Sequence, residues 1–289
     1  MNVDVTTTAV DQTVRRAAVL GSPIEHSLSP VLHGAAYQAL DLHGWHYDKI
    51  ECDEPGLSRL VDSMGPEWAG LSLTMPLKRV ALTVADEVSP LAEAVGAANT
   101  LVFPAAGPAG GRQAYNTDVA GMVSALKEAG LARVDQAVIL GAGGTAQGAL
   151  AAVRELGHQS PTVLVRNLAR TGELRETAER LGMRPTISAG LIEEPLPAAD
   201  LVISTLPGGA ADPLSSTRWQ PGTTVLDVVY APWPTPFAGS ALAAGCAVVS
   251  GLSVLLHQAV AQVELMTGRP GPVEAMRTAL VAAVAARQG

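Results

Sequence analysis

The chain has 289 residues, of which 48% are hydrophobic, 16% are charged and only 3% are aromatic. This length exceeds one average domain and can bury a large core, which Ala, Val and Leu must build because aromatic residues are few. Nineteen basic against 27 acidic residues give a net charge of −8, which excludes the basic surface that binding to nucleic acid or an anionic membrane requires.

The polar N-terminal segment, the lack of a long apolar stretch and the few cysteines predict a soluble protein in a reducing compartment. The first dozen residues are polar and lack the apolar segment of a secretory signal, so we expect a frayed extension. No stretch of eighteen apolar residues follows that could span a membrane. Cys52 and Cys246 are too few for a disulfide framework and too widely spaced for a CxxC-type metal site, so we expect a cytoplasmic protein.

The N-terminal part alternates strand-like and helix-like segments. Apolar runs at 17–20 and 70–73 predict buried strands. Apolar residues that recur every three or four positions over 30–42 and 121–129 predict helices. The segment 103–115 is rich in Gly and Pro between two short strand-like runs, which predicts a hairpin.

A fresh start of strand, glycine turn and helix after Asp135 predicts a second domain. Strands are expected near 137, 162, 184, 201, 224 and 247. Helices are expected over 145–156, 168–181 and 235–244, and two more close the chain after Gly251. This alternation predicts the α/β class with parallel sheets. We expect a substrate domain at 14–118 and 252–289 and a doubly wound Rossmann-type domain at 119–251.

The glycine turn predicts a dinucleotide site. Gly141, Gly143 and Ala146 satisfy G-x-G-x-x-A directly after the apolar run 138–140 and before a helix that begins at Thr145. Glycine permits close approach of the backbone to a pyrophosphate, whose charge the free N–H groups of the helix stabilise. An ordinary turn between strand and helix is the alternative.

The residues that follow the next predicted strand, which ends at Val165, indicate which nicotinamide cofactor binds. Arg166, Asn167 and Arg170 occupy this position, with no carboxylate among them. A carboxylate would bind the ribose 2′-hydroxyl of NAD, whereas arginine favours the 2′-phosphate of NADP. The pattern favours NADP, although arginines at the start of a helix can also be merely solvated.

Four polar loops lie at strand ends in the first domain: GSPIEHSLSP at 21–30, SLTMPLK at 72–78, GAANT at 96–100 and YNTD at 115–118. Open α/β sheets bind ligands at such loops, so their polar groups could converge. Each loop also has a structural interpretation. Ser29 and Asp118 could cap the helices that follow them, and Thr74 could simply end a strand.

Taken together, these segments resemble the shikimate dehydrogenase family over nearly the whole chain, from Gly21 to about Ala275. The four loops are similar to the family's G-N-P-I-x-H-S-x-S-P, V-T-x-P-x-K, G-A-V-N-T and D-N-T-D motifs, in the same order. The GAGGTA turn and the later GLSVLLHQA segment also match.

The resemblance implies a role for each matching position. Lys78 and Asp118 would be the catalytic pair that reduces a cyclic keto acid. Lys78 would supply positive charge and a proton, and Asp118 would orient the substrate hydroxyl and Lys78. Whether the lysine alone or the coupled pair transfers the proton stays open. The substrate would contact Ser27, Ser29, Ser72, Thr74, Asn99 and Gln258. The NADP cofactor would contact Gly141, Ala142, Gly143, Gly144, Thr145, Ala146, Arg166, Asn167, Arg170, Thr205, Tyr230 and Gly251.

Three positions depart from the family pattern. Ser72 stands where the family usually has Asn, which opens the question of substrate preference. Ser22 and Val165 also replace Asn, but neither change removes a catalytic group.

Several alternatives remain open at this point. A quinate, shikimate or aminoshikimate dehydrogenase of the same family could use NAD or NADP. A non-catalytic ligand sensor would lack Lys78 or Asp118, and a folate-linked dehydrogenase would lack the four loops. We expect closure of the cleft about hinges near 117–121 and 251–254, and a monomer or homodimer.

No metal is expected, because the histidines of the first domain lack metal-site spacing and surface or capping roles suit them better. They are His26, His33, His43 and His46.

Overall fold

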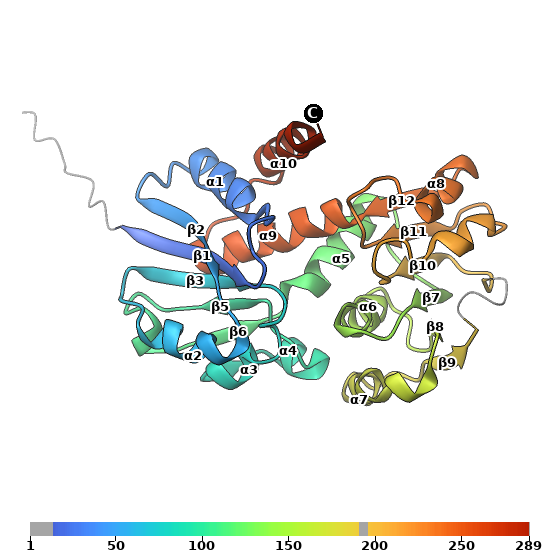
Figure 1. Ribbon diagram of the computed structural model, residues 1–289, viewed down its shortest axis with the longest axis horizontal. Helices are drawn as coiled ribbons and strands as arrows, with labels where there is room; N and C mark the ends of the chain where they lie inside the picture. The colour runs from blue at the N-terminus through green and yellow to red at the C-terminus, as the bar shows by residue number, and fades with distance from the viewer. Residues whose placement is uncertain (1–13, 191–195, 289) are drawn as a thin grey trace, which may run out of the picture.

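The computed structural model of the chain describes residues 14–190 and 196–288. Two six-stranded sheets, each covered by helices, form the two halves of the molecule (Figure 1). The expected N-terminal extension lies outside the described residues. The α/β class and the arrangement with two sheets are confirmed, while the domain boundaries remain predictions.

The first sheet is mixed. Its order is β2-β1-β3-β5-β6-β4, in which β1 pairs in parallel with β2 and β3, whereas β5 runs antiparallel to β3 and β6. The predicted hairpin is therefore confirmed, and it adds antiparallel pairs to the parallel strands of this sheet. The strands are β1 Arg15–Gly21, β2 Trp45–Glu51, β3 Trp68–Leu73, β4 Glu87–Val88, β5 Thr100–Val102 and β6 Gln113–Tyr115.

Helices cover both faces of this sheet and bury one core on each (Figure 1). One face carries α2 Glu54–Asp62, α3 Ala81–Val84 and α4 Pro90–Val95. On the other face α1 Ser29–Ala39 and α9 Gly251–Thr267 pack with α10 Val273–Gln288. The last two helices thus return to the N-terminal half. A short 3-10 turn, Pro108–Gly110, lies within the hairpin.

The second sheet is entirely parallel, in the order β12-β11-β10-β7-β8-β9. This is the doubly wound Rossmann order, whose direction of winding reverses between β7 and β10. All six predicted strands are confirmed. They are β7 Ala137–Leu140, β8 Thr162–Val165, β9 Thr186–Ala189, β10 Leu201–Ser204, β11 Thr224–Asp227 and β12 Ala247–Ser250.

The helices of this half also lie on two faces. The helices α5 Thr117–Glu128, α6 Gly144–Glu155 and α7 Gly172–Arg180 pack into one core. The other core contains α8 Pro236–Ala243 and the 3-10 turn Asp212–Ser216. The predicted helix at 168–181 is divided, because a separate 3-10 turn, Leu168–Arg170, precedes α7. The Asn167 side chain accepts a hydrogen bond from Ala169 N–H and so starts that turn by itself.

The strand directions explain why the polar loops converge. The carboxyl ends of β1, β3 and β6 meet at one edge of the first sheet, and the amino end of the antiparallel strand β5 lies at the same edge. The helices α5 and α9 run side by side from this edge to the second sheet (Figure 1). The loops therefore face the half of the molecule that is built on the second sheet.

Candidate active site

A cleft of about 370 Å³ opens at this edge of the first sheet. Val228 and Tyr230, which follow β11, and Gly251, which begins α9, also contribute to its wall. The structure thus brings together every catalytic and substrate residue predicted from the sequence. They are Ser27, Ser29, Ser72, Thr74, Lys78, Asn99, Asp118 and Gln258.

The centre of the cleft is an ion pair. Lys78 Nζ donates to Asp118 Oδ2 at 2.6 Å, and the two side chains are 33% and 25% exposed. Lys78 follows β3, while Asp118 lies in the first turn of α5, where the helix dipole favours a carboxylate. Asn116 caps α5 by accepting from Val119 N–H, so the capping interpretation of Asp118 is wrong and its carboxylate faces Lys78.

Asn99 connects this pair to α9. Its Nδ2 donates to Asp118 Oδ1 at 2.9 Å and contacts Gln258 Oε1 at 3.2 Å. Its Oδ1 accepts from the backbone N–H of Thr117 at 2.7 Å. Asn99 is only 2% exposed, and a buried amide with both ends bonded has one stable orientation. The Asp118 carboxylate is therefore held in place by side chains of the protein itself.

The serine loop lies at the start of α1. Ser29 is the first residue of this helix, and its N–H donates to Ser27 Oγ at 3.3 Å. Leu28 is the N-cap and makes no side-chain capping bond, so the capping interpretation of Ser29 is wrong. Thr74 directly follows the last residue of β3 and also lines the cleft.

Three residues of this site were missed by sequence reasoning. Tyr47 OH donates to Ser72 Oγ at 2.7 Å, and Ser72 Oγ donates to Gln262 Oε1 at 2.8 Å. His33 Nε2 lies 3.4 Å from the same Gln262 oxygen. These residues lie on β2, α9 and α1 and belong to no motif, so only the fold brings them together.

The environment of His33 differs from the prediction. His33 is fully buried within α1, so a surface or capping role is wrong for it, whereas His26, His43 and His46 are exposed. Burial lowers the pKa of His33 to about 3, and its hydrogen bond with Gln262 only partly opposes this. The ring is therefore neutral at ordinary pH.

The predicted cofactor turn lies where the winding of the second sheet reverses. Gly141 follows β7 with φ of +109°, and a Cβ there would lie 2.6 Å from Thr205 Oγ1, so only glycine fits. Gly143 caps α6 without a side-chain bond, and residues 143–145 are exposed. The amides that begin α6 are thus free to bind an anion.

Thr205 lies beside this turn, and Gly251 follows β12 at the same edge of the sheet. The Thr205 hydroxyl donates to the carbonyl of Leu140 at 2.7 Å, which ties the loop after β10 to the end of β7. A Cβ at Gly251 would lie 2.0 Å from the carbonyl oxygen of Val228, so this contact also requires glycine. Val228 and Gly251 both line the cleft and connect it to the second sheet.

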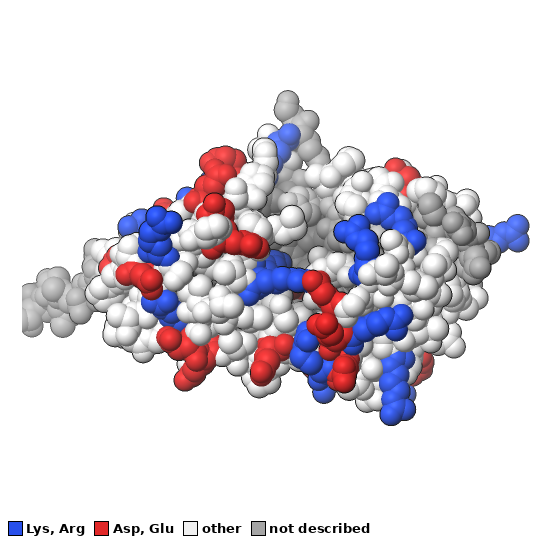
Figure 2. Space-filling view, turned by 60° about the horizontal axis from the view of Figure 1, so that its bottom comes forward, with Lys and Arg blue, Asp and Glu red and all other residues white. Residues whose placement is uncertain are grey.

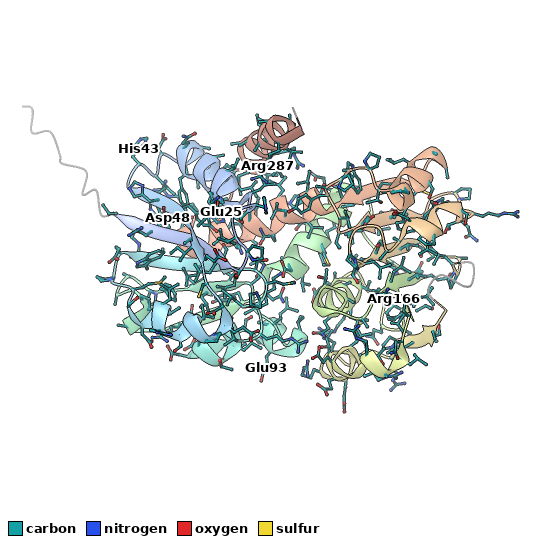
Figure 3. The ribbon with its side chains drawn as sticks, in the orientation of Figure 1. Glu25, His43, Asp48, Glu93, Arg166 and Arg287 are labelled. Atoms are coloured by element: carbon teal, nitrogen blue, oxygen red, sulfur yellow. The ribbon has the colours of Figure 1, made fainter. Side chains whose placement is uncertain are left out.

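Arg166, Asn167 and Arg170 follow β8 and are exposed, away from the residues that line the cleft. Within residues 14–190 and 196–288, neither arginine makes an ion pair. Figure 3 places Arg166 in the half built on the second sheet, and Figure 2 shows basic side chains on that half beside a hollow between the halves. Free amides and guanidinium groups at one sheet edge fit a phosphorylated dinucleotide.

Among the described residues, no cluster of three or more His, Cys, Asp or Glu side chains is suited to a metal ion. In the same part of the chain, no helix combines the length and apolar character that crossing a membrane requires.

A Rossmann sheet with an open glycine turn, next to a polar cleft with a lysine–aspartate pair, defines a two-domain dinucleotide-dependent oxidoreductase. Comparison with known proteins gives the family. The shikimate dehydrogenase substrate binding domain matches residues 19–101, and the shikimate 5′-dehydrogenase C-terminal domain matches residues 251–281. A shikimate dehydrogenase (NADP(+)) of Desulfitobacterium hafniense is 37% identical over 94% of this chain and 99% of its own.

Solved structures agree with the sequence comparison. Mycobacterium tuberculosis shikimate dehydrogenase is 44% identical with a TM-score of 0.82, covering 93% of this chain and 99% of that one. The Thermus thermophilus shikimate 5-dehydrogenase in complex with NADP(H) and shikimate is 31% identical with a TM-score of 0.78, covering 93% and 100%. The chain belongs to the shikimate dehydrogenase family.

Proposed function

We propose that this protein reduces 3-dehydroshikimate to shikimate with NADPH, reversibly, as a step in the synthesis of chorismate and aromatic amino acids. The observation that carries the proposal is the 2.6 Å pair of Lys78 and Asp118 inside a cleft lined by all the predicted substrate residues. Relatives named as NADP-dependent shikimate dehydrogenases support it.

The first half supplies the proton chemistry. When bound, NADPH supplies a hydride to the carbonyl carbon of the substrate, and negative charge develops on the carbonyl oxygen. The Lys78 ammonium stabilises this charge and donates a proton to the oxygen, so that an alcohol forms. Asp118 positions the ammonium and accepts a hydrogen bond from the substrate hydroxyl. In the reverse direction the neutral Lys78 amine accepts the proton.

The remaining polar groups of the cleft select the substrate. Ser27 and Ser29 at the start of α1 donate hydroxyl hydrogens to the carboxylate. Thr74, Asn99 and Gln258 contact ring hydroxyls. Because Asn99 and Gln258 are almost fully buried, a substrate that leaves them unpaired is disfavoured.

The second half binds the cofactor. Backbone N–H groups of residues 141–146 contact the pyrophosphate, and Arg166 with Asn167 and Arg170 binds the adenosine 2′-phosphate. Thr205, Tyr230 and Gly251 lie on the nicotinamide side. The support is the exposure of the turn and arginines, and the position of Tyr230 and Gly251 in the wall of the cleft.

We also propose the division of the chain at 118/119 and 251/252, with cleft closure about 117–121 and 251–254. The cores of the two sheets support this division, because each consists mostly of residues from one side of it; Val95 and Ala97 are the buried residues of the first domain that join the second core. Free cysteines at positions 52 and 246 support a cytoplasmic protein. A monomer or homodimer is proposed, which sedimentation analysis of the purified protein would decide.

The function is tested by following absorbance of the reduced nicotinamide with shikimate or quinate and with NADP or NAD. We expect the highest kcat/KM with shikimate and NADP. A preference for quinate or for NAD would contradict the proposed substrate or cofactor. No turnover with any combination, while shikimate still binds, would instead identify a ligand sensor.

A further inference from the structure

The side-chain amide of Gln262, beneath the cleft, has a single allowed orientation. Its Nε2 donates to the backbone carbonyl of Asn99 at 3.2 Å and to Thr100 Oγ1 at 3.1 Å. A carbonyl oxygen can only accept hydrogen bonds, so the NH₂ group must lie on that side. Gln262 is 1% exposed, and rotating the amide would place two oxygens against each other in a buried site. Its Oε1 therefore faces Ser72 and His33.

This orientation determines what Ser72 can offer to a ligand. A serine hydroxyl has one hydrogen and two lone pairs. The hydrogen is donated to Gln262 Oε1 at 2.8 Å, and one lone pair accepts the hydrogen of Tyr47 at 2.7 Å. Burial raises the pKa of Tyr47 well above its ordinary value, so the phenol stays protonated and remains a donor. Only one lone pair of Ser72 is left for the cleft.

His33 reinforces the arrangement from the opposite side. Its ring stacks on Tyr47 with centroids 3.9 Å apart and planes 14° apart, which fixes the direction of the phenol. Because Gln262 Oε1 only accepts, His33 Nε2 must carry the hydrogen that it shares at 3.4 Å. Two donors thus converge on Gln262 Oε1, which can accept both through its two lone pairs.

We propose that Gln262 makes Ser72 an acceptor-only group and thereby determines specificity at this position of the substrate ring. The substrate group that meets Ser72 must donate a hydrogen bond, so a hydroxyl is selected over a carbonyl, an ether or a fluorine. Gln262 acts as a positioning residue through Ser72, whereas Tyr47 occupies one of the two Ser72 lone pairs. The inference rests on the proposed function and names the chemistry of one ring position within it.

The test compares shikimate with analogues in which each ring hydroxyl other than the reacting one is replaced by hydrogen or fluorine. Dissociation constants are measured by calorimetry with the wild type and with Ser72→Ala. At one ring position, loss of the hydroxyl should weaken wild-type binding about three- to tenfold, as expected for one hydrogen bond. Fluorine there should bind no better than hydrogen, because it offers only lone pairs. In Ser72→Ala the loss should shrink to within about twofold.

Two variants separate positioning from a merely structural role. In Gln262→Met the Ser72 hydrogen becomes free, so the fluoro analogue should bind a few-fold tighter than the deoxy analogue. Tyr47→Phe is the matched control, because it leaves the bond from Ser72 to Gln262 in place and should keep the wild-type order. Circular dichroism checks folding. If Gln262→Met does not fold, the wild type and Ser72→Ala still decide the question.

The inference is overturned if fluorine binds better than hydrogen in the wild type at the position that Ser72→Ala identifies, or if no position responds to Ser72→Ala. Turnover of shikimate with NADP is recorded for the wild type in the same series. Absence of that turnover refutes the proposed function, whereas normal turnover with the wrong order of analogues refutes only the role of Gln262.

Discussion

The two halves of the site differ in how their polar groups are held. In the substrate half, Ser72, Asn99 and Asp118 are bonded to other side chains and to backbone groups, and the first two are almost fully buried. In the cofactor half, Arg166 and Arg170 are exposed on the strand tip, and the glycine turn leaves its amides open. The substrate half therefore holds its polar side chains in place before a ligand binds. In the cofactor half, the exposed arginines and amides can take up their final positions when the ligand binds.

Burial explains the difference. A buried polar group without a partner costs about 1–3 kcal/mol, so the substrate half must satisfy its groups within the protein. An exposed guanidinium is solvated by water and needs no partner until a phosphate arrives. We therefore expect changes in the substrate half to affect turnover and stability, and changes in the cofactor half to affect mainly the Michaelis constant of the cofactor.

The largest effect on turnover is expected for Asp118→Asn in the substrate half. The substitution removes the charge that positions Lys78 at 2.6 Å and places an NH₂ group or a neutral oxygen against the ammonium. We expect kcat to fall on the order of 10²- to 10⁴-fold, as when a group of a proton-transfer pair is lost. Steady-state kinetics measure this. Asp62→Asn, which alters an exposed pair with Arg112, is the control and should be near wild type.

A smaller and more selective effect is expected for Arg166→Ala. Loss of a hydrogen bond to a charged phosphate corresponds to about 1.5–3 kcal/mol, so the Michaelis constant for NADP should rise on the order of ten- to a hundredfold. The constant for NAD, which lacks this phosphate, should not change. Arg133→Ala removes another exposed arginine and serves as control. Equal losses with both cofactors would argue against recognition of the 2′-phosphate.

A third prediction concerns His33, which is buried beneath the substrate half, and the dependence of the free energy of unfolding on pH. The pKa of His33 falls from 6.5 to about 3 on folding, so the unfolded chain binds the extra proton between these values. Stability from neutral His33 is complete above about pH 6.5 and is lost as pH falls, by at most about 1.4 kcal/mol per pH unit. Urea unfolding of His33→Asn should show a shallower slope there than the wild type.

The exposed His43→Asn is the matched control for that experiment and should keep the wild-type slope. An unchanged slope in His33→Asn would mean that His33 is not held neutral by burial.

The smallest effect is expected at the contact between the halves. Arg79 forms an ion pair with Glu173 on α7, and both side chains are more than half exposed. Exposed pairs contribute about 0–1 kcal/mol because solvent screens them. A double-mutant cycle of Arg79→Ala and Glu173→Ala in urea should give a coupling energy in this range. A larger value would mean that the halves are joined more firmly than their exposed contact implies.

Much of the second half could be predicted because its signals are local. A buried parallel strand is a continuous apolar run, and Gly141 with Gly143 follows such a run directly. β2 could not be found in this way, since its sequence WHYDKIE mixes charged and aromatic residues and its residues are only half-buried or exposed. Its position next to β1 depends on long-range pairing.

The same reasoning applies to the active site. Lys78, Asn99 and Asp118 belong to segments that resemble family motifs, so their convergence could be predicted from loop order. His33, Tyr47 and Gln262 have no such motif, and their roles follow from contacts between α1, β2 and α9. Apolar neighbours such as Leu32 and Ala36 do not by themselves show that a histidine of the same helix is buried, so sequence reasoning gives His33 a surface or capping role.

The central claim, that Lys78 transfers the proton in a site that binds shikimate independently of it, is tested most directly by Lys78→Ala. The turnover number and the shikimate dissociation constant are measured on the same preparation, with the exposed Lys127→Ala as control. In Lys78→Ala we expect the turnover number to fall at least about a hundredfold, while the dissociation constant for shikimate changes by less than about tenfold. Near-normal turnover, or loss of binding as large as the loss of turnover, would contradict it.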